Sequence, residues 1–238
     1  MKANEVKDMI GIIGAMDEEV NELKAGMEEV KVTTKASMEF YEGTIAGKKV
    51  VVVRSGIGKV NAGICTQILV DVFNVDCIIN TGIAGALNND INICDIVIST
   101  EALEHDMDVT PLGYEKSVIP DMETSVFKAD KRLMEVAKKS AKEAELDVKI
   151  FEGKVVSGDQ FIGTAEKKKY LRDQFGGDCA EMEGASIAHA AYLNNIPFLV
   201  IRAISDKADG GAEMDYPTFE KKAAENSIEL MYKIIKNY

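Results

Sequence analysis

The sequence predicts an α/β fold, with a single domain in which helices flank both faces of a central β-sheet. Short β-rich runs alternate with helical segments along the chain, as expected when a sheet lies between layers of helices. The strand segments are continuous runs of Val, Ile and Leu rather than strict alternations, which indicates burial on both faces of the sheet. No stretch rich in Pro, Gly or Ser divides the 238 residues, so one domain is expected.

The expected strands are β-rich runs bounded by glycine or other turn residues. In chain order they cover residues 10–15, 39–47, 48–56, 76–85, 95–102, 151–159 and 197–206. The expected helices have apolar residues returning every three or four positions. They cover residues 17–28, 59–74, 130–145, 165–175, 181–194 and 217–237. The polar residues 1–9 are expected to form a loose extension, and residues 10–238 the domain.

Two segments depart from this simple alternation. The helices over 130–145 and 165–175 are rich in lysine, and we expect these lysines to lie on solvated faces. Residues 104–125 show little periodicity and form a longer connection than most compact domains contain. We therefore expect residues 104–125 to be functional or to form an interface.

Composition and charge exclude several classes of partner. The net charge of −12 disfavours nucleic acid and anionic membranes, which need a concentrated positive surface. No apolar run approaches the roughly 20 residues that cross a bilayer. The cysteines show neither a C-x-x-C pair nor the spacing of a disulfide framework, so four reduced, mostly buried thiols in a soluble cytoplasmic protein are expected. They are Cys65, Cys77, Cys94 and Cys179.

Small and acidic residues follow several expected strands, where ligands bind in open α/β sheets. Ser205 and Asp206 end the apolar run "VIRAISD", which also carries Arg202. They either serve a ligand or cap the following helix. Glu181 and Glu183 immediately precede a helix of small residues, so they either hold a ligand or complement the helix dipole.

Two further motifs each permit two interpretations. The glycines of "SGIGKVNAG" (55–63) indicate either a phosphate-binding turn or a tight strand-to-helix turn, although the spacing matches neither common nucleotide motif. His105, Asp106 and Asp108 form either a metal site or, as we expect, a local hydrogen-bonding cluster. His189, in an apolar helix, is expected to be a core or interface residue, and no metal is expected.

Seven segments occur in the order found in one enzyme family. They are "IGIIGAMDEEV", "SGIGKVNAG", "NTGIAGAL", "DMDVTPLGYE", "VSGDQFI", "AEMEGASIAHA" and "PFLVIRAISDKAD". In these segments the chain resembles the 5'-methylthioadenosine/S-adenosylhomocysteine nucleosidases, from residue 10 to near the C-terminus. The pair "GAMDEEV" and "RAISDKAD" favours these nucleosidases within the wider nucleoside phosphorylase superfamily.

The resemblance implies a nucleoside phosphorylase-like fold with a mixed central sheet, a homodimer, and no cofactor or metal. It implies hydrolysis of the N-glycosidic bond of 5'-methylthioadenosine and S-adenosylhomocysteine, and of 5'-deoxyadenosine as well. The products would be adenine and the 5'-substituted ribose, with a place in methionine salvage. The preference among these substrates and futalosine-type nucleosides stays open.

The resemblance also implies catalytic roles. Asp206 would protonate purine N7, with burial helping it to hold a proton, while Ser205 orients it and Arg202 supplies a structural charge. Glu19 would activate the water that attacks an oxocarbenium-like C1'. Glu183 would accept hydrogen bonds from both ribose hydroxyls, because one carboxylate has two oxygens for a vicinal diol.

The remaining site residues are implied by resemblance to line the substrate. Those expected around the ribose and purine are Met16, Phe161, Ile162, Glu181, Met182 and Tyr216. Those expected around the 5' substituent are Ile57, Val109, Leu112, Tyr114 and Pro120, of which the last three would reach across the dimer. Ile83 stands where the family usually has serine, and "EMEGAS" is closer to the phosphorylases than the commoner "EMEATA".

The residues favour hydrolysis over two alternative functions, phosphorolysis and nucleoside binding without catalysis. Phosphorolysis needs arginines around a phosphate, and this chain has only Arg54, Arg132, Arg172 and Arg202. Glu19 would repel a phosphate but could activate water, so hydrolysis is favoured. A nucleoside-binding protein without catalysis could dispense with Glu19 and Asp206, and both are present.

Overall fold

The computed structural model describes residues 9–207 and 216–238, with side chains from residues 9–207 and 221–238. Residues 1–8 of the expected extension lie outside the described residues. The first strand starts at Met9, one residue before the expected boundary, and Met9 donates a backbone hydrogen bond to Asp76 (2.8 Å). Among the described residues, no helix combines the length and apolarity that crossing a bilayer requires.

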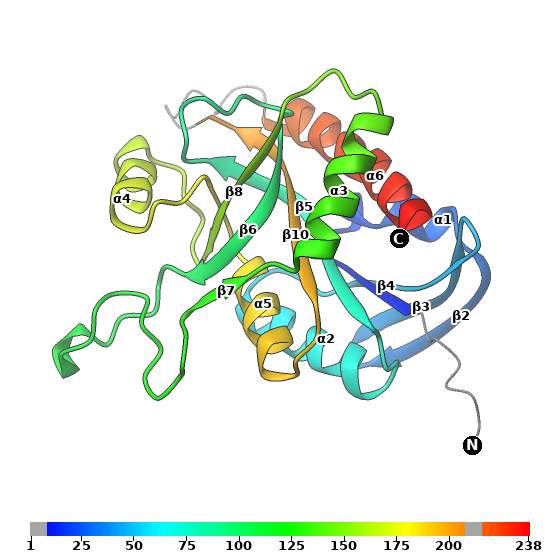
Figure 1. Ribbon diagram of the computed structural model, residues 1–238, viewed down its shortest axis with the longest axis horizontal. Helices are drawn as coiled ribbons and strands as arrows, with labels where there is room; N and C mark the ends of the chain where they lie inside the picture. Colours follow the sequence, from blue (N-terminus) through cyan, green and yellow to red (C-terminus); the bar gives the residue numbers. More distant parts are fainter. Residues whose placement is uncertain (1–8, 208–215) are drawn as a thin grey trace.

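The described strands form one mixed sheet with helices on both faces, which confirms the predicted fold class (Figure 1). The strands are β1 (Met9–Gly14), β2 (Glu28–Lys35), β3 (Met38–Ile45), β4 (Lys48–Arg54), β5 (Cys77–Ala86), β6 (Ile96–Glu104), β7 (Val126–Lys128), β8 (Ile150–Ser157), β9 (Cys179–Glu181) and β10 (Phe198–Asp206). The helices are α1 (Asn21–Ala25), α2 (Lys59–Asp71), α3 (Lys131–Glu143), α4 (Ala165–Phe175), α5 (Gly184–Leu193) and α6 (Tyr216–Asn237), with short 3-10 helices η1 (Asp17–Glu19) and η2 (Thr110–Leu112).

Part of the sheet closes on itself. β5 pairs with β10 along most of its length and with β9 at its end, while β10, β6, β8 and β9 pair in succession. These five strands therefore form a closed ring, and β1, β4, β3 and β2 extend from β5 as an open wing. The closure brings the end of β10 against residues 83–85 of β5 and β9 against Gly85 and Ala86, so that β9 and β10 both pair with β5 at Gly85.

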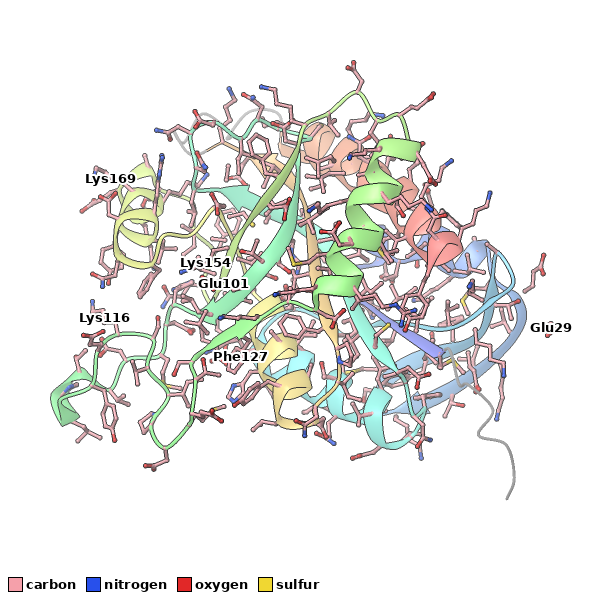
Figure 2. The ribbon with its side chains drawn as sticks, in the orientation of Figure 1. Glu29, Glu101, Lys116, Phe127, Lys154 and Lys169 are labelled. Atoms are coloured by element: carbon pink, nitrogen blue, oxygen red, sulfur yellow. The ribbon has the colours of Figure 1, made fainter. Side chains whose placement is uncertain are left out.

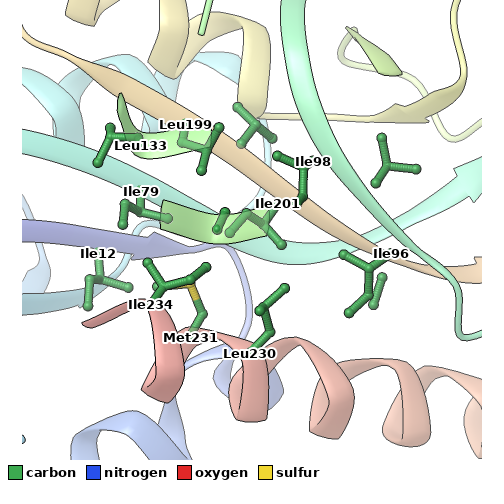
Figure 3. Close-up of a cluster of buried hydrophobic side chains, with 14 of the residues drawn as sticks. Ile12, Ile79, Ile96, Ile98, Leu133, Leu199, Ile201, Leu230, Met231 and Ile234 are labelled. Atoms are coloured by element: carbon green, nitrogen blue, oxygen red, sulfur yellow. The ribbon is translucent and has the colours of Figure 1, made fainter. Parts of the chain in front are cut away.

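The core fills the two layers between sheet and helices. On one face, isoleucines of the central strands pack against Leu230, Met231 and Ile234 of α6, all fully buried (Figure 3). On the other face, α2 and α5 pack against each other and cover β1 and β4. Burying one such side chain stabilises the fold by about 1.5–3 kcal/mol, so the strands are held rigidly beneath the loops at their ends.

The bounds predicted for some helices were wrong, and some short or exposed strands were not predicted. The helix expected over 17–28 is only η1 and α1, and its last residue already belongs to β2. β2 was missed because its sequence "EEVKVTTK" is charged and mostly exposed, as is common for an edge strand. The helix expected from residue 181 begins at Gly184, because Cys179–Glu181 pair as β9. The short β7, which pairs with β6, was also missed.

Candidate functional site

One cavity collects most of the predicted site residues. Its lining comes from the ends of β1, β5, β9 and β10, the loop before α2 and the loop before α4. The predicted residues that line it are Met16, Glu19, Ile57, Phe161, Ile162, Glu181, Met182, Glu183, Ser205 and Asp206. The structure thus brings together four carboxylates from three segments that lie far apart in the sequence.

Glu19 is held from several directions. It is 5 % exposed, and its Oε2 accepts hydrogen bonds from the backbone N–H groups of Ala15 (2.6 Å) and Met16 (3.0 Å). Its Oε1 accepts one from the N–H of Ile83 (3.0 Å). Burial raises the pKa of Glu19, and the Arg202 charge and these N–H groups partly oppose the rise. The carboxylate is therefore fixed in position at the β1 end of the cavity.

Gly82 makes room for that carboxylate. A Cβ atom at residue 82 would lie 2.4 Å from Oε1 of Glu19, which is closer than any real contact. Gly85 does the same for Asp206, whose Oδ1 would lie 3.0 Å from an added Cβ. Residues 82 and 85 are three apart on one strand, which corresponds to roughly 10 Å. The two glycines therefore set Glu19 and Asp206 apart along the floor of the cavity.

Arg202 and Glu181 form a buried ion pair behind the cavity. Arg202 is 2 % exposed, and its Nε and Nη2 donate to Oε2 of Glu181 while Nη2 also donates to Oδ1 of Asn80. Glu181 accepts further hydrogen bonds from the hydroxyl of Ser157 and the N–H of Gly184 (2.8 Å). Because both Glu181 oxygens have protein partners, Glu181 lines the cavity chiefly as an anchor for Arg202 and α5.

Glu183 has an oxygen to spare. Its Oε1 accepts a hydrogen bond from the N–H of Gly58 (2.7 Å), at the start of α2. Its Oε2 accepts none from the groups that the structure describes. Burial, and the nearby Glu181 and Glu19 carboxylates, raise the pKa of Glu183 to about 8.

The glycine turn "SGIGKVNAG" is a strand-to-helix turn whose amides hold the protein's own acids. Gly56 and Gly58 have φ of +83° and +98°, a conformation that favours glycine. The N–H of Lys59 donates to Oδ1 of Asp159 (2.8 Å), as that of Gly58 does to Glu183. The first amides of α2 are therefore occupied by carboxylates.

Asp206 sits at an irregularity in β10. The register against β5 shifts between Ile204 and Asp206, so Ser205 is the extra residue that turns Asp206 toward Gly85. The Ser205 hydroxyl lies 3.2 Å from Oδ1 of Asp206. Oδ2 accepts a hydrogen bond from Nζ of Lys168, a buried lysine of α4. The Asp206 carboxyl group is therefore contacted by a hydroxyl at one oxygen and by an ammonium at the other.

Lys168 corrects one expectation directly. The lysines of residues 165–175 were expected to lie on a solvated face, but Lys168 is 1 % exposed. The sequence contained the signal, because Lys168, Leu171 and Phe175 are spaced three and four residues apart and are all buried on one side of α4. Sequence reasoning also missed the lining residues Ala15, Ala84, Gly85, Gln160 and Ala180.

The predicted 5'-pocket residues do not line the cavity of this chain, apart from Ile57. Val109, Leu112, Tyr114 and Pro120 belong to the long connection between β6 and β7, which extends away from the sheet (Figure 1). Leu112 is 74 % exposed and Tyr114 39 %. Tyr216 is the first residue of α6, and its side chain lies outside the described residues.

A polar network includes part of the segment that holds His105, Asp106 and Asp108. Lys59 bridges Glu104 (2.9 Å) and Asp106 (2.7 Å), and His189 contacts Glu104 (3.0 Å) while stacking on Phe127. Across residues 9–207 and 221–238, no three His, Cys, Asp or Glu side chains gather as a metal site would require. Of the three motif residues, Asp106 belongs to this network and Asp108 accepts a hydrogen bond from the N–H of Thr110 (3.0 Å), whereas Nε2 of His105 is buried without a hydrogen-bond partner among the described residues.

The pKa of Glu183 predicts a dependence of stability on pH. Between about pH 5 and pH 8 the folded protein keeps a proton on Glu183 that the unfolded chain releases, since the ordinary pKa of a glutamate is 4.5. Folding that retains protons becomes less favourable as pH rises. In Glu183→Gln, the free energy of unfolding should therefore fall less over this range than in the wild type, by about 1–3 kcal/mol.

Urea denaturation at both ends of that range measures the difference. Glu166→Gln is the control, because Glu166 is exposed on α4 and should leave the pH dependence unchanged. Parallel curves for the wild type and Glu183→Gln would show that Glu183 is ionised throughout, contrary to this account.

Comparison with known proteins agrees with the fold. The family model described as the phosphorylase superfamily matches residues 9–236. A 5'-methylthioadenosine/S-adenosylhomocysteine nucleosidase of Staphylococcus aureus is 42% identical over 228 residues, covering 95% of this chain and 99% of that protein.

Solved structures extend the comparison. The nucleosidase of the same name from Neisseria meningitidis, in complex with methylthio-immucillin-A, has a TM-score of 0.92 and 39% identity, covering 97% of this chain and 100% of that one. A futalosine hydrolase of Helicobacter pylori has a TM-score of 0.90 and 30% identity, covering 98% and 99%. On these matches, the chain belongs to the phosphorylase superfamily and, within it, to the 5'-methylthioadenosine/S-adenosylhomocysteine nucleosidase family.

Proposed function

We propose that this protein hydrolyses the N-glycosidic bond of 5'-methylthioadenosine and S-adenosylhomocysteine, and of 5'-deoxyadenosine as well. The observation that carries the proposal is the arrangement of Glu19, Glu183 and Asp206 around one cavity. Two of these acids, Glu19 and Asp206, contact different positions of β5, at Gly82 and Gly85, so they stand at separate parts of the cavity.

At the purine end, Asp206 is the general acid. An anionic purine is a poor leaving group, so protonation of N7 makes cleavage of the N-glycosidic bond easier. Asp206 stands at the end of β10 with Ser205 against one oxygen, which orients the carboxyl group. Phe161, 73 % exposed beside the cavity, offers a face for the purine, and the backbone of Phe161 and Ile162 can meet its edge.

At the sugar end, Glu183 recognises the ribose and Glu19 activates water. The free Oε2 of Glu183, together with Oε1, can accept hydrogen bonds from two neighbouring hydroxyls. Three backbone N–H groups hold Glu19 on the β1 side of the cavity, where it can take a proton from the water that attacks C1'. The negative charge on Glu19 also stabilises the cationic sugar of the transition state. Met16 and Met182 form apolar walls.

Hydrolysis is favoured over phosphorolysis by what surrounds the sugar end. None of the four arginines lines the cavity, and Arg202 is already paired with Glu181. The amides of Gly58 and Lys59, the groups best placed to bind a phosphate, hold carboxylates instead. A phosphate would therefore meet Glu19 and Glu183, and the described residues that line the cavity include no lysine or arginine to balance its charge.

The hydrolytic reaction can be tested directly with 5'-methylthioadenosine in phosphate-free buffer. We expect adenine release, with 5-methylthioribose identified by mass. A requirement for phosphate, with a sugar 1-phosphate as product, would mean phosphorolysis. Tight binding of the nucleoside without adenine release would mean a binding protein.

A matched pair of variants places the water-activating base. Glu19→Gln should lower kcat by at least about 100-fold, as expected for loss of a general base. Glu18→Gln, an exposed neighbour in the same 3-10 turn, should leave kcat unchanged. Equal activity in the two variants would remove Glu19 from the mechanism.

We further propose a homodimer in which the connection between β6 and β7 completes the 5' end of the partner's site. In the single chain, the apolar side chains of Leu112 and Tyr114 in this connection are exposed to solvent. Ile57, at the cavity, is 55 % exposed. Exposed apolar residues of α2 and α5, including Val60 and Leu193, extend this surface. Pro120 and Val109 would contribute from the same connection.

Light scattering measures the assembly. We expect a molar mass of about 52 kDa, which is twice the 26.0 kDa of the chain. Leu112→Asp should weaken dimerisation and raise KM for 5'-methylthioadenosine together. A monomeric wild-type protein with full activity would exclude a shared site.

The four cysteines are free thiols, and three are buried, which supports a reducing, cytoplasmic location. A role in methionine salvage follows from the proposed substrate, because its 5'-methylthio group carries the sulfur that would be recovered.

A further inference from the structure

The lysine at position 168 behaves unlike its neighbours. Lys169 points away from α4 into solvent (Figure 2), whereas Lys168 is 1 % exposed and points inward. Its Nζ donates hydrogen bonds to Oδ2 of Asp206 and to the backbone carbonyl of Lys207. A lysine is rarely buried this completely unless it is paired, so the pairing with Asp206 explains its place.

The two contacts of Lys168 join segments that serve the same part of the site. α4 begins four residues after Phe161, so it continues directly from the loop proposed to meet the purine. Asp206, the proposed proton donor, is the last residue of β10, and Lys207 follows it. Lys168 therefore ties the purine-binding loop to the acid and fixes the orientation of the Asp206 carboxyl group.

Charge gives this contact a chemical consequence. Purine N7 and a carboxylate oxygen both accept hydrogen bonds, so one proton must lie between them when the purine is bound. As that proton moves from Asp206 to N7 and the C1'–N9 bond breaks, the carboxyl group becomes a buried anion. Such an anion is unfavourable unless an opposite charge is close, and the Lys168 ammonium is already bound to Oδ2.

We propose that Lys168 is the positioning residue of Asp206, orienting the carboxyl group and balancing the negative charge that appears on it when N7 is protonated. The inference rests on the proposed function, since it needs Asp206 to be the proton donor. Lys168 acts through Asp206 rather than on the substrate, so its effect belongs to the chemical step rather than to substrate binding.

Steady-state kinetics of three variants test this. Lys168→Met should lower kcat for 5'-methylthioadenosine by about 100-fold, similar to removing one donor to a developing charge, with KM within about three-fold. Lys168→Arg keeps a positive donor and should retain kcat within about ten-fold. Lys169→Met, on the exposed side of the same helix, should match the wild type.

A double-mutant cycle with Asp206→Asn separates this role from a structural one. If Lys168 acts through Asp206, adding Lys168→Met to Asp206→Asn should lower kcat no further. A wholly additive loss, or a rise in KM equal to the fall in kcat, would overturn the proposal. If Lys168→Met fails to fold by circular dichroism, Lys168→Gln and Lys168→Arg take its place in the same cycle.

The same variants separate the role of Lys168 from the role of Asp206 in the proposed hydrolysis. Wild-type kcat in Lys168→Met, with an inactive Asp206→Asn, would reject the role of Lys168 and leave the proposed hydrolysis intact. Wild-type kcat in Asp206→Asn would reject Asp206 as proton donor, and the role of Lys168 with it.

Discussion

The candidate site depends on one buried ion pair, between Arg202 and Glu181. Around the cavity, Glu19, Glu181 and Glu183 are all at most 8 % exposed, and Arg202 is the cation that lies among them. Burial lowers the pKa of the Arg202 guanidinium, but the three carboxylates outweigh this and raise it. Breaking a buried pair by removing one partner costs about 3–5 kcal/mol, because the other charge is left unbalanced. The Arg202 charge thus offsets the cost of burying three acidic side chains close together.

Backbone N–H groups also hold the acidic side chains of the site in place. Amides at the ends of β1 and in β5 hold Glu19, the first amide of α2 holds Glu183, and the first amide of α5 holds Glu181. These donors cannot move far, because the strands and helices that carry them are packed into the core. The acids are therefore oriented before any substrate arrives, which is the condition for strong electrostatic stabilisation of a cationic sugar.

The sequence allowed the fold class and ten lining residues to be predicted, but not the contacts that hold them. Asp206 stood out because it ends an apolar strand, where ligands bind in α/β sheets, whereas the role of Glu19 was implied by the family resemblance. Closure of the ring through β9 could not be foreseen, since three residues before a helix carry little strand signal. This closure is what places Glu181 beside β5.

Single residues show the same limit. The glycines of "NTGIAGAL" were noticed as part of a motif, yet their physical purpose, clearing space for Glu19 and Asp206, required coordinates. Lys168 was grouped with surface lysines because composition outweighed its helical spacing from Leu171 and Phe175. Ile83 stands where a serine is usual, and its backbone N–H still binds Glu19, so the contact made by the main chain does not depend on the side chain.

The central claim is that a nucleoside lies with its glycosidic bond between Glu19 and Asp206. The most direct measurement is a crystal structure with a non-hydrolysable analogue of 5'-methylthioadenosine. We expect Asp206 to form a hydrogen bond with purine N7 and Glu183 to form hydrogen bonds with both ribose hydroxyls. Glu19 should lie on the opposite side of C1', next to a water. A nucleoside bound with N7 away from Asp206, or with its ribose away from Glu183, would contradict it.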